Sequence, residues 1–99
     1  MKRRLIRYRT ASNQTLDNVK LIEGVFEELH AKEPVGVRYL VLKLDDGGFV
    51  HFVEADDNSS PLTDLEAFRA FQNRLKDRQI EPTAVSGAVV VGDYRMLSK

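Results

Sequence analysis

The stretch that decides the fold runs from Val35 to Ala55 and reads VGVRYLVLKLDDGGFVHFVEA. Two apolar runs in it are joined by Asp45-Asp46-Gly47-Gly48. Asp46-Gly47 is a strong signal for a β-hairpin, because a type I′ turn needs a positive φ at both central residues. The sequence therefore predicts two antiparallel strands within residues 35–55.

A two-residue turn at Asp46-Gly47 fixes how these two strands pair. It places Leu44 opposite Phe49, and directly opposed residues share a face of the sheet. One face is then expected to carry Leu40, Leu42, Leu44, Phe49, His51 and Val53, and the other Val37, Tyr39, Val41, Lys43, Val50, Phe52 and Glu54. A one-residue bulge near Gly47-Gly48 would shift this register.

Both predicted faces of the hairpin are apolar at their centres. A sheet with one solvated face alternates cleanly between apolar and polar residues, so each face of this sheet needs a cover. Helices can cover one face, but a chain of 99 residues has no second sheet for the other. We therefore expect a second copy of the chain to pack on the sheet, which makes the protein a homodimer.

The composition sets further limits on the class of protein. Residues 1–99 are predicted to form a single domain, and their formal net charge is zero. A balanced charge argues against a nucleic-acid or anionic-membrane binder, which is normally basic. The absence of cysteine excludes disulfides and cysteine-ligated zinc. We also find no membrane-spanning apolar run and no secretory signal, so we expect a cytoplasmic protein.

The rest of the chain predicts two helices and two more strands around the hairpin. A strand is expected at residues 5–10, with Ile6 and Tyr8 on one face. A helix follows from about residue 15 to Glu33, because Leu16, Val19, Ile22, Val25, Phe26 and Leu29 recur at three- and four-residue spacing. Asn13 or Thr15 is the expected N-cap of this helix, and Pro34 ends it.

The second half of the chain repeats this arrangement. Thr63-Asp64-Leu65-Glu66 has the pattern of a capping box and predicts a helix that stops before Pro82. Residues 87–92 are expected to form a short buried strand. The order β-α-β-β-α-β is the ferredoxin-like arrangement, an α+β fold. Right-handed crossovers then give an antiparallel sheet with the strands in the order 4-1-3-2.

His51 is the candidate for acid–base chemistry, because the pKa of an unperturbed histidine lies near neutrality. The alternative is a hydrogen-bonded histidine in the core or in the dimer interface. Arg7 and Arg9 share a face of the first strand and either bind an anion or form ion pairs, with Glu54 as a candidate partner. Asp45-Asp46 and Asp56-Asp57 lie at opposite ends of one strand, so we expect no metal site there.

Two activities known on this topology are disfavoured. Gly48-Phe49-Val50-His51-Phe52 matches the tail of an RNA-recognition motif, but the basic and aromatic residues that open this motif are missing. We therefore expect no nucleic-acid partner. Acyl-phosphate hydrolysis needs a glycine-rich loop with an arginine after the first strand, and Ala11-Ser12-Asn13-Gln14 has neither.

The sequence resembles the dimeric α+β barrel superfamily, which includes the antibiotic biosynthesis monooxygenases, and within it small uncharacterised bacterial members. The resemblance covers nearly the whole chain. It is carried by Leu5-Ile6-Arg7-Tyr8-Arg9, Gly36-Val37-Arg38-Tyr39, Leu44-Asp45-Asp46-Gly47, Phe49-Val50-His51, Pro61-Leu62, Leu65 to Gln72, Asp77-Arg78 and Gly92-Asp93-Tyr94-Arg95. It implies a homodimer whose two sheets pack face to face and a small pocket between sheet and helices in each subunit.

In characterised members such a pocket holds an aromatic substrate or heme, often without a separate cofactor. This chain has no tryptophan and so lacks the tryptophan-dependent site of the heme-degrading members. We expect no cofactor and no metal, a small apolar or aromatic ligand, and His51 as the catalytic candidate. The pocket is expected to be lined by Tyr8, Tyr39, Phe49, Phe68 and Phe71. Two functions stay open: a cofactor-independent oxidation, and a non-catalytic homodimeric binding or stress-type protein.

Overall fold

The computed structural model describes residues 2–56 and 62–97. Its strands are β1 (Lys2–Arg9), β2 (Val37–Lys43), β3 (Gly48–Ala55) and β4 (Ala84–Gly87), and its helices are α1 (Thr15–Lys32), α2 (Glu66–Gln72) and α3 (Leu75–Arg78). All strand pairs are antiparallel, in the order β2-β3-β1-β4. This is the predicted order of the sheet, so the α+β ferredoxin-like fold is confirmed.

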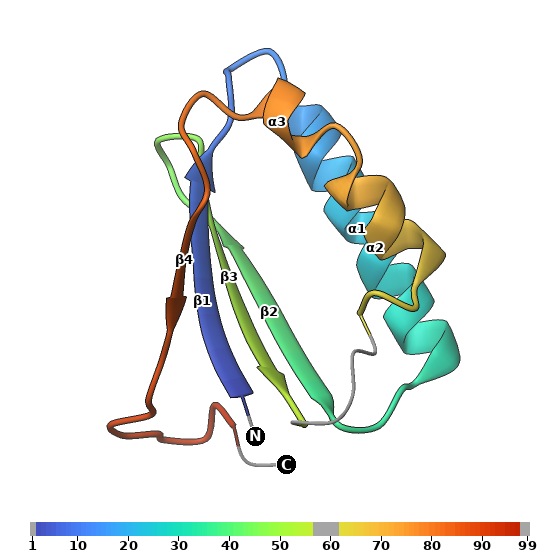
Figure 1. The fold of residues 1–99 in the computed structure, drawn as a ribbon, viewed down its shortest axis with the longest axis vertical. Coiled ribbons are helices and arrows are strands. Elements are labelled where there is room, and N and C mark those ends of the chain that lie inside the picture. Colours follow the sequence, from blue (N-terminus) through green and yellow to red (C-terminus); the bar gives the residue numbers. More distant parts are fainter. Residues whose placement is uncertain (1, 57–61, 98–99) are drawn as a thin grey trace.

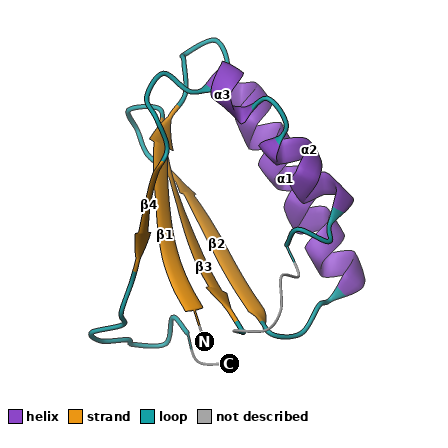
Figure 2. Ribbon diagram, viewed as in Figure 1, coloured by secondary structure: helices purple, strands orange, loops and turns teal. Residues whose placement is uncertain are grey.

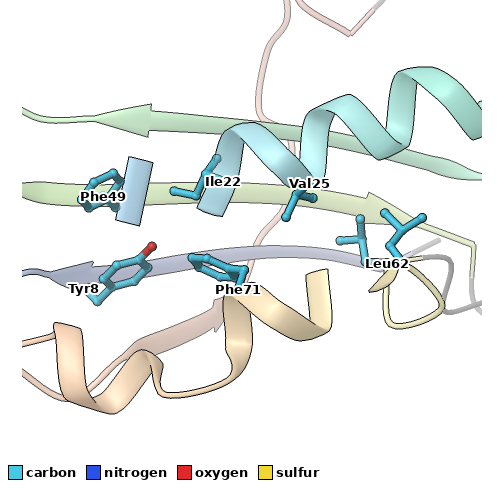
Figure 3. Close-up of a cluster of buried hydrophobic side chains, with 7 residues drawn as sticks. Tyr8, Ile22, Val25, Phe49, Leu62 and Phe71 are labelled. Atoms are coloured by element: carbon cyan, nitrogen blue, oxygen red, sulfur yellow. The ribbon is translucent and has the colours of Figure 1, made fainter. Parts of the chain in front are cut away.

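The three helices lie on one face of the sheet (Figures 1 and 2). The core lies between α1, α2 and this face. It is formed by Tyr8, Ile22, Val25, Phe49, Leu62, Leu65 and Phe71 (Figure 3). Tyr8 and Phe49 come from the two central strands, so the middle of the sheet carries two of these three aromatic core residues, and Phe71 comes from α2.

The predicted register of the hairpin is wrong by one residue. Lys43 pairs with Phe49, and Val41, not Leu42, pairs with His51. The turn holds three residues instead of two, because Gly47 has a φ of +86° and Asp46 Oδ1 accepts a hydrogen bond from the Gly48 N–H at 2.9 Å. The extra turn residue moves every side chain of β2 to the face of the sheet opposite to the predicted one, since side chains alternate along a strand.

The exchange places the leucines of β2 on the face opposite the helices. Leu40, Leu42 and Leu44 are 43%, 50% and 41% exposed. The corrected register puts Leu5, Val50 and Phe52 on the same face. None of the described helices covers this face, which we call the open face (Figure 1).

The capping-box interpretation of Thr63 is also wrong, because α2 begins at Glu66 without a side-chain cap of its own. Glu28 of α1, a residue outside this helix, caps the N-terminus of α2 instead. Its carboxylate accepts hydrogen bonds from the backbone N–H groups of Glu66 at 3.3 Å and Ala67 at 2.8 Å. The predicted second helix is divided, since Arg74 has a φ of +62° between α2 and α3.

The predicted buried strand at residues 87–92 is wrong as well. β4 ends at Gly87, and Val89 and Val91 are 85% and 99% exposed. The first helix differs less from its prediction. It begins at Thr15 after Gln14, which forms no side-chain cap, and Leu16 at its start is 63% exposed rather than part of the core.

Candidate functional site

His51 lies in the middle of β3 and points toward the helices, where it is 2% exposed. Both of its ring nitrogens meet tyrosine hydroxyls. The Tyr8 hydroxyl lies 2.9 Å from Nε2, and the Tyr39 hydroxyl lies 2.7 Å from Nδ1. The three side chains come from the three adjacent strands β1, β3 and β2, so the sheet itself holds this arrangement.

The hydrogen bonds continue from Tyr8 into the helices. Asn18 of α1 donates from Nδ2 to the Tyr8 hydroxyl at 2.9 Å, and Arg78 of α3 donates from Nε to Asn18 Oδ1 at 2.9 Å. Arg78 also donates to the backbone carbonyls of Phe71 and Asn73. Asn18 and Arg78 are 0% and 6% exposed, so this is a buried polar chain in an otherwise apolar core. We call it the polar chain: Arg78, Asn18, Tyr8, His51 and Tyr39.

Burial sets the protonation states in the polar chain. It lowers the pKa of His51 to about 4, so the imidazole is neutral near pH 7. It raises the pKa of Tyr8 to about 12, against the smaller opposing effects of the Asn18 hydrogen bond and the Arg78 charge. Burial also raises the pKa of Tyr39. The two hydroxyls and the imidazole are therefore all uncharged near pH 7.

The six residues predicted for the site lie together. The rings of Tyr8 and Phe49 stack at 5.5 Å, that of Phe71 lies 5.4 Å from His51, and that of Phe68 meets Tyr39 edge-on at 6.3 Å. These aromatic side chains fill the space around His51 themselves.

An open groove of about 520 Å³ lies beside this cluster, between α1 and the edge strand β2. Its lining is apolar except for charged or polar side chains at Glu23, Glu27, His30 and Lys43. The apolar lining residues are Val19, Ile22, Phe26, Val41 and Phe49. Phe26 also stacks on the ring of Tyr39 at 5.1 Å, which joins the groove to the polar chain.

Of the predicted pocket residues, only Phe49 lines this groove. Tyr8 and Phe49 line a smaller cavity of about 200 Å³ near Arg9 and Pro82. His51 lines neither of these two hollows. The predicted aromatic residues thus lie around His51, whereas the groove beside them has a lining that, apart from Phe49, was not predicted.

Asn18 and Arg78 were also not predicted as part of the site. A signal for both was present in the spacing. Asn18 precedes Ile22 and Val25 by four and seven residues, and Arg78 follows Phe71 by seven, so both polar residues fall on apolar faces of the two helices predicted from the sequence. A polar residue in such a position must find a partner inside the core, which is what these two do.

Two of the remaining charged candidates, Arg9 and Asp46, form ion pairs at one end of the open face. Arg9 pairs with Asp46 at 2.8 Å and with Glu81 at 3.4 Å. Glu54, the expected partner of Arg7 and Arg9, pairs instead with Arg3 at 2.7 Å. Asp57 lies outside the described residues, and within residues 2–56 and 62–97 no group of acidic or histidine side chains could hold a metal ion.

Comparison with solved structures relates this geometry to known proteins. A crystal structure named antibiotic biosynthesis monooxygenase superposes with a TM-score of 0.69 and 18% identity, covering 93% of this chain and all of that one. A candidate antibiotic biosynthesis monooxygenase from Nitrosomonas europaea gives a TM-score of 0.72 at 13% identity, covering 91% and 89% of the two chains. A further candidate from Caulobacter crescentus gives 0.68 at 14% identity, covering 92% and 90%.

The chain has the fold of the antibiotic biosynthesis monooxygenases. The resemblance found in the sequence is therefore confirmed at the level of the fold. No protein-family model matches the chain, and no curated protein sequence is significantly similar to it. In the part of the chain that the structure describes, no helix is both long and apolar enough to cross a membrane.

Proposed function

We propose that this protein binds a small apolar or aromatic molecule in the groove between α1 and β2. The observation that carries the proposal is the groove itself: about 520 Å³ of open volume, with an apolar lining that includes Phe26, Val41 and Phe49. Volumes of this order hold drug-sized ligands, and such sites combine apolar walls with a few polar groups. Glu23, Glu27, His30 and Lys43 supply polar groups in this groove.

A substitution within the groove tests this proposal without disturbing the core. Glu27 lines the groove and is exposed, so Glu27→Trp places an aromatic ring over the binding volume from the helix surface. Lys20 is exposed on the same helix but does not line the groove, which makes Lys20→Trp the matched control. We expect 1-naphthol to shift the backbone amide resonances of Phe26 and Val41 in the wild type and in Lys20→Trp, but much less in Glu27→Trp. Equal shifts in both variants would contradict binding in the groove.

A second candidate function is the cofactor-independent oxidation that the fold suggests, with His51 as the acid–base group. A neutral imidazole surrounded by aromatic rings beside an apolar groove favours it, because a neutral imidazole can accept a proton as a general base. Against it, both His51 nitrogens are already hydrogen-bonded to Tyr8 and Tyr39. The rival is a binding protein that performs no reaction. Oxygen consumption distinguishes the two: consumption by the wild type with an aromatic ligand, lost in His51→Gln, supports the oxidation, and no consumption by the wild type with a ligand that it binds supports the binding protein.

We further propose that the protein is a homodimer in the cytoplasm, with a second copy of the chain covering the open face. This face has an apolar centre in Leu40, Leu42 and Phe52 and ion pairs toward its ends, Arg3–Glu54 at one and Arg9–Asp46 at the other. An apolar centre with a polar rim is the usual anatomy of a protein interface. Two such sheets packed face to face would form the dimeric barrel.

A further inference from the structure

Beyond β4 the chain continues as an apolar segment that the described residues leave largely uncovered. Residues 88–91 read AVVV, and Val89 and Val91 are 85% and 99% exposed. We call residues 88–91 the C-terminal arm. Valine is enriched in strands because it packs well on a pleated surface, so three consecutive valines favour pairing with a neighbouring strand. The arm therefore has the composition of a strand but no sheet to join in its own chain.

The arm leaves its own sheet after its first residue. The Ala88 N–H donates a hydrogen bond to the Arg3 carbonyl oxygen at 3.0 Å, which extends the pairing of β4 with β1 by one residue. No backbone hydrogen bond joins residues 89–91 to any other residue that the structure describes. The chain leads away from the helices here, on the side of the open face (Figure 1). The arm is thus an unpaired strand on the side where a second copy is proposed to pack.

The opposite edge of the sheet carries the backbone groups that the arm lacks. β2 is an edge strand, and the Leu44 N–H donates to the Gly48 carbonyl oxygen at 2.8 Å, so the even-numbered residues of β2 face β3. The N–H and C=O groups of Tyr39 and Val41 then point outward along the free edge. Natural proteins protect such edges with charges, proline or bulges, and β2 has none of these between Tyr39 and Leu42.

We propose that the C-terminal arm of each copy pairs with the free edge of β2 in the other copy, so that the two subunits exchange strands. This rests on the proposed homodimer and goes beyond it, because packing of the open faces alone leaves both arms and both edges unpaired. A strand that bends out of one sheet and continues into the next closes the corner between two packed sheets. Two-fold symmetry makes the two contacts identical, as in any isologous interface.

The exchanged arm also reaches the groove of the other copy. Val85 of β4 pairs with Ile6 on the helix-facing side, so alternation places Val89 and Val91 on that side too. In a closed barrel this side is the outer side of both sheets. A strand added to β2 continues the floor of the groove, to which β2 contributes Val41. Each groove is therefore built from two chains, and the valines of the arm lengthen its apolar floor while its mouth stays open.

Amide hydrogen exchange tests the pairing residue by residue. We expect slow exchange at Tyr39 and Val41 in the wild type, because the arm accepts hydrogen bonds from their N–H groups. The double variant Val90→Pro/Val91→Pro removes the pairing, since N–H groups alternate and one of two neighbouring ones must face β2. Exchange at Tyr39 and Val41 should then be roughly 10-fold faster or more, whereas Leu42, which bonds to β3, should stay protected.

The matched control is Val90→Thr/Val91→Thr, which keeps the N–H groups and the preference for strands and should exchange as the wild type does. Fast exchange at Tyr39 and Val41 in a dimeric wild type would overturn the exchange of strands. Slow exchange at both that survives the two prolines would overturn it as well.

A dimer mixed from ¹³C-labelled and unlabelled chains locates the arm directly. We expect intermolecular NOEs between the methyl groups of Val89 or Val91 in one copy and those of Val41 in the other. A dimer without NOEs from the arm would overturn the exchange and leave the homodimer intact. A monomeric wild type would overturn both.

The part of the arm in the groove is tested with 1-naphthol. We expect it to shift the amide resonance of Val91 together with those of Phe26 and Val41. Within one chain Val91 follows β4, at the opposite edge of the sheet from β2, so its shift reports the other copy. Shifts at Phe26 and Val41 alone would overturn the two-chain groove and leave the proposed binding intact. No shift at any of the three would instead overturn the proposed binding, whatever the NOEs show.

Discussion

His51 makes the stability of this protein depend on pH in a defined direction. Burial lowers its pKa from 6.5 to about 4 in the folded state, so on acidification the unfolded chain takes up the proton first. The contribution of His51 to the free energy of unfolding is complete above about pH 6.5 and is lost progressively as the pH falls toward about 4. The shift corresponds to a loss on the order of 3 kcal/mol in the free energy of unfolding.

Comparison with His51→Gln isolates this effect from the carboxylates, which both proteins share. We expect the difference between the unfolding free energies of wild type and variant, measured in urea, to shrink by about 2–3 kcal/mol between about pH 7.5 and about pH 4.5. A difference that stays constant with pH would mean that His51 titrates normally in the folded protein.

At the scale of single elements, the β2–β3 turn decides which residues of β2 face the groove beside α1. Gly47 adopts a φ of +86°, where an L side chain is strained. We expect Gly47→Ala to lower the unfolding free energy by about 1–2 kcal/mol in thermal or urea denaturation. Gly92→Ala is the control, because an added Cβ there meets no other atom within 4 Å and should change stability little. Equal losses in the two variants would show that the turn does not require glycine.

The same turn shows how far the sequence predicts this structure. The spacing of apolar residues was sufficient for the number of strands and the identity of α1, because periodicity depends only on neighbours along the chain. The strand order then followed from the handedness of the crossovers. It was not sufficient for the faces of β2, because two- and three-residue turns are both compatible with Asp45 to Gly48 and differ by one step of register. This one-residue shift of register places His51 on the same face of the sheet as Tyr39 and not on the face of Leu40 and Leu42.

The residue types of the site could be predicted from local patterns, but the contacts between its residues could not. Tyr8, Tyr39 and Phe71 could be recognised as aromatic residues on apolar faces, but their contacts with His51 join the four separate elements β1, β2, α2 and β3. The cap that Glu28 gives to α2 likewise joins two helices far apart in sequence. Contacts of this kind depend on tertiary packing, which local patterns do not encode.

At the scale of the whole molecule, the described helices cover only one face of the sheet. The open face exposes Leu40, Leu42 and Leu44 together, and a contiguous apolar patch of this kind marks an interaction site. The residues of the polar chain and the groove lie on the opposite side. A partner on the open face would therefore complete the sheet without closing the groove.

Leu42→Glu tests this assembly, because Leu42 is 50% exposed in the single chain and is not needed for its core. We expect the wild type to sediment as a dimer over about 1–100 µM, and Leu42→Glu to sediment as a folded monomer with an unchanged far-UV circular dichroism spectrum, since a buried charge without a partner opposes association. Val85→Glu is the control, because Val85 is 58% exposed on the helix-facing side of β4 and should leave the dimer intact. A monomeric wild type, or a dimer that survives Leu42→Glu, would contradict assembly through the open face.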